Sequence, residues 1–232
     1  MSIKETIARL IPARLLAPII QRRTWTSRVT SDDDDHLSLY WNSVDNPRRR
    51  ALIEVVASQL KDRPHPTSIL EFGSHVGVNL RLLSEIPGLE YADYFALEPN
   101  FEAVDFLRSK LPAVRVLRAD HRGFLRSRDF PNAPVTLSFA NAVLYALSPR
   151  AAHRVVRKML ATSSIVVIGE NLENSTGVKS TFAGAHTSFA HPFETWIRAE
   201  GVTDISVVPL DEADYALSGF MIAIRHDVAR GD

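Results

Sequence analysis

Short apolar runs alternate with segments of helical periodicity along most of this chain, and this alternation constrains the fold more than any other feature of the sequence. Val, Ile, Leu and Phe dominate five runs that we predict as strands, at 68–72, 94–99, 114–120, 135–141 and 164–171. Helical segments separate them, at 79–87, 100–111, 121–127 and 148–162. Strands that are apolar on both faces and alternate with helices predict a parallel sheet covered by helices on each side. Because crossovers between parallel strands are right-handed, the sheet should be doubly wound.

Both ends of this pattern are marked in the sequence. Asn46 can cap a helix and Pro47 suits the first helical position, so a helix should begin there. Near the C-terminus a helix at 191–201 precedes strands at 205–210 and 219–226. The connection between these strands, about eight residues, is too short for a helical crossover, so we expect an antiparallel hairpin at one sheet edge. The predicted fold class is α/β, a doubly wound Rossmann-like sheet of seven strands with an N-terminal helical arm.

Composition excludes several classes of function. The 232 residues suffice for one domain with a short appendage, and 27 basic residues balance 27 acidic ones, so we expect no non-specific binding of nucleic acid. The chain has no cysteine, which excludes disulfides, thiolate metal sites and cysteine nucleophiles. No apolar run reaches the roughly 20 residues of a membrane-spanning helix. Arg9 and Arg14 interrupt the apolar start, unlike a secretory signal, so the expected compartment is the cytoplasm.

Residues 1–45 form a separate segment before a predicted domain at 46–232. Its first thirty residues carry six basic side chains and one acid, with apolar residues at helical spacing that Pro12 and Pro18 interrupt. This basic arm could pack on the domain or on a second subunit in a homodimer, or it could lie on an anionic membrane surface. The acidic run at 31–36 is interpreted as a solvated linker and not as a metal site, and no metal is predicted.

A polar stretch rich in Gly, Ser and Thr occupies residues 174–190. We expect a long loop there, and loops of that length in a compact domain usually have a function.

Polar residues gather where the predicted strands end. In a doubly wound sheet, ligands bind outside the carboxyl ends of the strands. The residues at these ends are Glu71 and Gly73, Glu98, Asp120, Asn141, and Glu170 with Asn171. Glu98 lies 21 residues after Gly77, close to the spacing at which an acid accepts hydrogen bonds from ribose hydroxyls. The alternative is a surface acid whose charge complements the dipole of the helix that follows.

The strand-to-helix turn in "ILEFGSHVGVNL", residues 69–80, lacks the G-x-G-x-x-G pattern of a pyrophosphate site. Glu71 stands just before the turn and would repel a phosphate, which argues against a nicotinamide cofactor. The same carboxylate would favour a ligand with an amino group and a positive charge. S-adenosylmethionine is such a ligand, with a sulfonium, an amino acid tail and no phosphate.

The turn resembles the first motif of the class I S-adenosylmethionine-dependent methyltransferases, acid-x-Gly-x-Gly-x-Gly, over Glu71–Gly77, although His75 replaces the middle glycine. The resemblance covers roughly residues 46–226 and implies the strand order 3-2-1-4-5-7-6 with the last strand antiparallel. It implies S-adenosyl-L-methionine as cofactor and S-adenosyl-L-homocysteine (SAH) as product. The implied cofactor-binding residues are Glu71, Gly73, Ser74, His75, Gly77, Asn79, Glu98, Pro99, Asp120, His121 and Asn141. Among them Gly73 and Gly77 would line the methionine part, Glu98 would hold the ribose, Asp120 would meet the adenine amino group, and Asn141 would lie beside the sulfonium.

A larger middle residue in this motif, followed by "GVNL", is similar to methyltransferases of bacterial glycan and cell-surface pathways. The segment "LYWNSVDNPRRR" is also reminiscent of that group. Tyr40 and Trp41 could close over the cofactor or the acceptor, with Asn171 as a further acceptor contact. Plain packing of the arm on the sheet edge is the alternative for the two aromatic residues.

The resemblance implies methyl transfer to a small-molecule acceptor, by O- or N-methylation of a sugar, glycan precursor or natural product. An oxygen acceptor needs a base, and the candidates are His191, His186 and Glu170. An RNA or protein methyltransferase would require a recognition domain or basic groove that the sequence does not show. A non-catalytic relative that keeps the fold as a binding or scaffold module is the third reading, and only His75 favours it.

Overall fold

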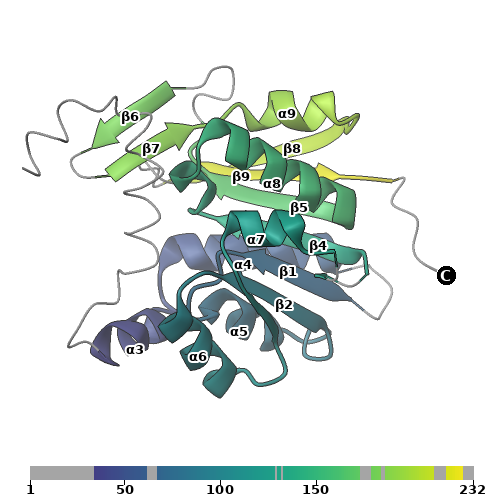
Figure 1. Cartoon of the computed structure of the whole chain (residues 1–232). Coiled ribbons are helices and arrows are strands. Elements are labelled where there is room, and N and C mark those ends of the chain that lie inside the picture. Colours follow the sequence, from purple (N-terminus) through teal and green to yellow (C-terminus); the bar gives the residue numbers. More distant parts are fainter. Residues whose placement is uncertain are drawn as a thin grey trace, which may run out of the picture.

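The computed structural model describes residues 34–61, 67–128, 130–131, 133–172, 179–183, 186–211 and 218–226. Its centre is a seven-stranded sheet in the order β3-β2-β1-β4-β5-β9-β8 (Figure 1). The strands are β1 Ser68–Phe72, β2 Asp93–Glu98, β3 Arg115–Arg118, β4 Val135–Asn141, β5 Ser163–Glu170, β8 Asp204–Pro209 and β9 Gly219–Ile224. The first five run parallel, whereas β9 is antiparallel to both β5 and β8. The predicted fold class, strand order and antiparallel last strand are confirmed.

Helices cover both faces of the sheet. One face is covered by α4 Pro47–Leu60, α5 Val78–Ser84 and α6 Phe101–Lys110, and the other by α7 His121–Arg126, α8 Pro149–Thr162 and α9 Phe193–Ala199. Side chains of the same strand alternate between the two cores: Ile69 of β1 packs in the first and Leu70 in the second. The double layer explains why the predicted strands are apolar on both faces.

The start of α4 follows from its sequence. The Asn46 side-chain oxygen accepts hydrogen bonds from the backbone N–H groups of Arg48 and Arg49, at 3.0 and 3.3 Å, and Pro47 occupies the first turn. The predicted helix start at Asn46 is confirmed.

The long loop expected at 174–190 is wrong in part. Strands β6 Lys179–Ala183 and β7 His186–Ala190 pair as a separate antiparallel hairpin, outside the seven-stranded sheet (Figure 1). Thr and Phe, which favour strands, recur on either side of Gly184, and this local pattern outweighs the loop-like overall composition.

The linker expected at 31–36 is also wrong in part, because helix α3 Asp34–Asn42 begins inside the acidic run. An apolar stripe follows the acids: Leu37 is buried in a small core with Val76, Val78 and Ala103. Burial of this stripe gives the helix the tertiary support that the acidic start lacks. Residues 1–33, with the basic arm and its two alternative positions, lie outside the described residues.

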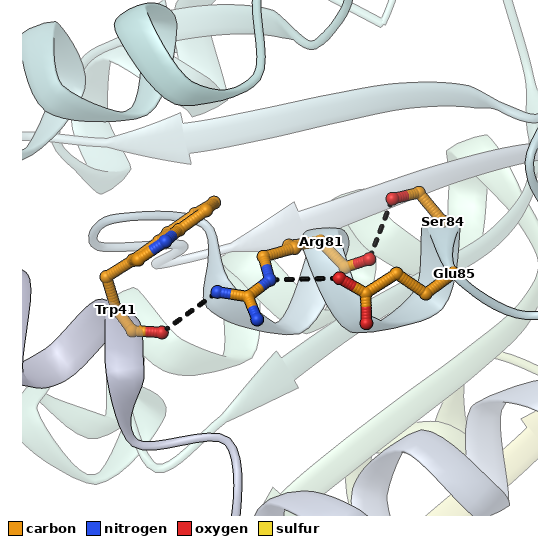
Figure 2. A network of polar contacts seen from close by, with 4 residues as sticks. All are labelled: Trp41, Arg81, Ser84 and Glu85. Carbon is orange, nitrogen blue, oxygen red and sulfur yellow. Dashed lines mark hydrogen bonds and ion pairs between the residues drawn. The ribbon is translucent and has the colours of Figure 1, made fainter.

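A polar network holds α3 to α5 (Figure 2). The Arg81 guanidinium lies 4.8 Å from the centre of the Trp41 ring and donates a hydrogen bond to the Trp41 carbonyl oxygen at 3.4 Å. Its Nε also pairs with Glu85, at 3.0 Å. On α6, Phe106 meets the Trp41 ring edge-on, with 5.9 Å between ring centres. The Trp41 ring therefore packs against side chains of α5 and α6 and anchors α3 on them.

Over the described part of the chain, no helix combines the length and the apolar character that crossing a membrane requires.

Replacing Trp41 by Ala should detach α3 from the domain. We expect the free energy of unfolding to fall by about 2 kcal/mol, less than the roughly 3–5 kcal/mol of a fully buried Trp because Trp41 is only half-buried. Urea denaturation measures the change. As a matched control, Glu85→Gln removes an exposed partner of the same network and should change stability by less than about 0.5 kcal/mol. Equal effects of the two substitutions would contradict the anchoring role of Trp41.

Candidate functional site

A cavity of about 550 Å³ opens at the carboxyl ends of β1, β2 and β4, where the sequence placed the site. Its lining includes most of the predicted binding residues: Tyr40, Glu71, Gly73, Ser74, His75, Asn79, Glu98, Pro99, Asp120, His121 and Asn141. The strand-end rule therefore brings together side chains that are up to 70 residues apart in the chain, from Glu71 to Asn141.

Other predicted site residues do not line this cavity. Gly77 caps α5 in a left-handed conformation and faces Leu107, and Trp41 packs between α5 and α6. Glu170, Asn171 and His191 are absent from the lining. His186 begins β7, and its side chain lies outside the described part.

Internal hydrogen bonds use up N–H groups of the turn after β1. Gly73 and Ser74 both donate to the Leu97 carbonyl oxygen, at 2.8 and 3.1 Å, and Gly77 donates to the Ser74 carbonyl oxygen at 2.8 Å. The His75 N–H donates to a carboxylate oxygen of Glu98 at 2.9 Å. A pyrophosphate site requires such N–H groups to point at the ligand, so this turn is unsuited to a diphosphate.

His75 is a non-glycine residue in the left-handed region, with φ +48°. This conformation costs about 1–2 kcal/mol for an ordinary residue. Its ring meets Tyr40 edge-on, with 4.5 Å between ring centres, and His36 lies 6.2 Å away. Burial, with smaller contributions from His36 and Arg49, lowers the pKa of His75 to about 4, so the imidazole is neutral at physiological pH.

Glu71 is the end of a relay that begins at Arg49. Arg49 Nε donates to Asn79 Oδ1 at 3.0 Å, and Asn79 Nδ2 donates to Glu71 Oε1 at 2.7 Å. The other carboxylate oxygen, Oε2, is buried and has no partner among the described atoms. Burial raises the pKa of Glu71 to about 8, against the lowering effects of Asn79 and Arg49. The cavity thus contains a buried carboxylate oxygen suited to a cationic partner.

Glu98 is held differently, by backbone donors. One oxygen accepts from the Asn100 N–H at 2.9 Å and the other from His75, and burial raises the pKa of this carboxyl. Each oxygen retains further acceptor capacity, which suits two neighbouring hydroxyl groups.

Asp120 and Asn141 complete this part of the lining. One Asp120 oxygen caps α7 by accepting the N–H groups of Arg122 and Gly123, at 3.0 and 2.9 Å. Asn141 Oδ1 is buried without a partner among the described atoms, and a Cβ at position 169 would lie 2.5 Å from it, so Gly169 makes room for the amide.

Residues 142–147, here called the wall loop, form another side of the cavity through Val143, Tyr145 and their neighbours. The Glu170 carboxylate accepts the N–H groups of Val143, Leu144 and Tyr145, at 2.9, 2.5 and 3.3 Å. Burial raises the pKa of Glu170 to about 8 although these three hydrogen bonds lower it.

His191, which lies between β7 and α9, also contacts the wall loop. Its Nε2 donates to the Leu144 carbonyl oxygen at 2.9 Å, because a carbonyl only accepts, and only 1% of the residue is exposed. Burial lowers the pKa of His191 to about 4, so the ring is neutral.

The sequence interpretation missed several lining residues, among them His36, Arg49, Arg122 and Tyr145. Tyr145 lies four residues after the end of β4, so a search that continued a few residues past each strand would have included it. Arg49 stands in the basic helix start, but only the fold reveals that it reaches Asn79. Within the part of the chain that the structure describes, no cluster of three His, Cys, Asp or Glu could hold a metal ion.

No family model matches the sequence, and a search of the curated proteins finds no match. Solved structures do match. One is the N-terminal domain of EvdMO1, determined in the presence of SAH and D-fucose, with 13% identity, TM-score 0.61, and 78% of this chain and 84% of that chain covered. The chain has the Rossmann-like methyltransferase fold.

Two further neighbours support the fold assignment. The amino pentose methyltransferase CalS10 from Micromonospora echinaspora has 14% identity and TM-score 0.57, with 84% of this chain and 98% of that chain covered. The sugar N-methyltransferase KedS8 from Streptoalloteichus has 16% identity and TM-score 0.58, with 86% and 96% covered.

The buried Glu71 should make stability depend on pH. The folded state keeps the Glu71 proton up to about pH 8, whereas the unfolded state releases it near 4.5. Unfolding therefore releases a proton within this window, and the free energy of unfolding falls as pH rises through it. Glu71→Gln removes this proton and should give a shallower decline of Tm, leaving the variant at least about 2 °C above the wild type at pH 9. Thermal unfolding at several pH values measures it, and parallel curves for the two proteins would contradict the prediction.

Proposed function

We propose that this protein transfers a methyl group from S-adenosylmethionine to a small-molecule acceptor, by O- or N-methylation of a sugar or a related natural product. The observation that carries the proposal is the buried oxygen Glu71 Oε2 in the cavity, for which the described part of the chain supplies no partner. A buried carboxylate oxygen without a partner is costly, and a ligand with an ammonium or sulfonium group would satisfy it.

The remaining lining fits the other parts of this cofactor. Glu98 would accept hydrogen bonds from the ribose hydroxyls, and Asp120 with His121 would meet the adenine. Asn141 would lie beside the sulfonium. The N–H groups of the turn donate within the protein, which favours this cofactor over a dinucleotide.

When bound, S-adenosylmethionine supplies a methyl group on a sulfonium that a nucleophilic oxygen or nitrogen can displace. The residues of this chain would bind and orient the two reactants, which can lower the barrier by several kcal/mol, up to about 10. Tyr40 and the neutral His75 would shield the cavity from water.

The nature of the neighbours supports a sugar-like acceptor. CalS10 is described as an amino pentose methyltransferase and KedS8 as a sugar N-methyltransferase, and the EvdMO1 domain was studied with D-fucose. Neutral overall charge also favours a small acceptor over a nucleic acid. For such an acceptor we expect a soluble enzyme in the cytoplasm.

Calorimetric titration tests the cofactor. We expect the wild type to bind S-adenosylmethionine with proton release at pH 7, because a cation at Glu71 stabilises the carboxylate whose pKa is about 8 in the free protein. Affinity should rise between about pH 6 and 7.5, the upper limit being set by the ligand's own amino group. Glu71→Gln should weaken binding at least tenfold and abolish the proton release. Glu85→Gln is the control with wild-type affinity, and absence of binding to the wild type would leave only a scaffold role.

A transfer assay with tritiated methyl donor tests the acceptor. Sugars and nucleotide-linked sugars, RNA and peptides are offered separately. We expect label only in the sugar fraction, and Glu98→Ala should reduce the incorporation at least tenfold because cofactor binding is lost. Label in RNA or peptide would overturn the small-molecule assignment.

A further inference from the structure

The wall loop exposes one side to the cavity and turns its backbone toward the protein interior. Val143 and Tyr145 line the cavity, whereas Leu144 between them is fully buried in the core beneath. Val143 also packs closely on the turn after β1: a Cβ on Gly73 would lie 2.7 Å from Val143 Cγ2. The position of this loop therefore sets the width of the cavity between the loop and the turn.

The backbone of Leu144 is held at both of its polar groups. Its N–H donates to Glu170 at 2.5 Å, and its carbonyl oxygen accepts from His191 Nε2 at 2.9 Å. Glu170 is the last residue of β5, and His191 directly follows β7, so two separate segments of the chain meet at this one residue.

The loop also contains a strained residue that needs such support. Ala142 has φ +49°, a left-handed conformation that a non-glycine residue rarely adopts. Its N–H donates to the Gly169 carbonyl oxygen at 2.8 Å, next to Glu170. Strained backbone persists where its surroundings over-determine it, which is frequent at functional sites.

The ring of His191 is itself fixed by aromatic neighbours. Trp196 and Phe193 of α9 lie 5.2 and 5.4 Å from it, and Phe189 of β7 lies 6.0 Å away, between ring centres. His191 is thus a rigid donor and not a side chain that could turn toward the cavity.

We propose that Glu170 and His191 are positioning residues, which act through the peptide groups of Leu144 to fix the wall loop against the turn after β1. They take this role in place of the role of base considered from the sequence, because neither lines the cavity. The inference rests on the proposed function for its effect on ligand binding, but the loop itself can be tested without a ligand.

Two substitutions at position 191 separate the hydrogen bond from the ring. His191→Phe keeps an aromatic ring but removes the side-chain donor to the Leu144 carbonyl, which then accepts, among the described residues, only the Leu147 N–H, at 2.9 Å. His191→Gln places an amide N–H near the position of Nε2 and should restore the contact. The measurements are SAH affinity by calorimetry, well below each variant's Tm, and hydrogen exchange of the amides of Val143, Leu144 and Tyr145.

We expect His191→Phe to weaken SAH binding at least tenfold and to speed exchange in the wall loop at least tenfold, with exchange in β1 and β2 unchanged. His191→Gln should stay within about threefold of the wild type, a difference below 1 kcal/mol. His153→Phe is the matched control, because this ring also stacks on Trp196, at 4.9 Å, but lies half-exposed on α8. It should alter neither measurement.

Wild-type affinity and exchange in His191→Phe would overturn the inference, as would a Gln variant as impaired as the Phe variant. A role in stability alone would lower Tm while leaving SAH affinity of the folded protein intact, and this result would also overturn it. If His191→Phe does not fold, Glu170→Gln tests the same loop from the other side, with faster exchange expected. Failure of the wild type to bind SAH would instead refute the proposed function, while the exchange data would still decide the loop.

Discussion

The burial of carboxylates at the ends of parallel strands is the constraint on which this structure depends. A carboxylate removed from water must be paired, hydrogen-bonded or protonated. Glu71 is the last residue but one of β1, next to the central strand β4, with 2% of its surface exposed. Its relay through Asn79 reaches Arg49, which also donates to the Ser43 hydroxyl at 2.6 Å. One buried carboxyl group thus links α4, α5 and the residue after α3 to β1.

Three strand-end acids are accommodated in two different ways. Glu98 and Glu170 accept backbone N–H groups, and each fixes a loop that borders the cavity: Glu98 the turn at His75, and Glu170 the wall loop. Glu71 accepts only one side-chain donor and keeps an oxygen without a partner among the described atoms. Two of the acids therefore shape the cavity, and the third keeps an oxygen that has no partner among the described atoms and suits a cation.

The sequence predicted the strands and the strand-end residues, because apolar runs and their connections determine a doubly wound sheet. The strand order came from the resemblance of the first turn to the methyltransferase motif. The sequence did not predict which way each side chain at a strand end points. Glu170 and Glu71 occupy similar places in the pattern, yet Glu170 turns away from the cavity to a loop 25 to 27 residues earlier in the chain. The hairpin β6–β7 and the start of α3 were missed for a related reason: composition over 174–190 and 31–36 is polar, whereas local strand propensity and tertiary burial decide both elements.

The side chain at His75 is consistent with a ligand that carries no diphosphate. Glycine in this turn is needed where backbone must approach a phosphate closely. Here the N–H of residue 75 already donates to Glu98, and the side chain lies against Tyr40 at the edge of α3. A ligand recognised by carboxylates through its hydroxyl and ammonium groups does not require that approach, so the position is free to carry a ring. The same ring then gives α3 an aromatic partner at the cavity, and the cost of the left-handed backbone is offset by that contact.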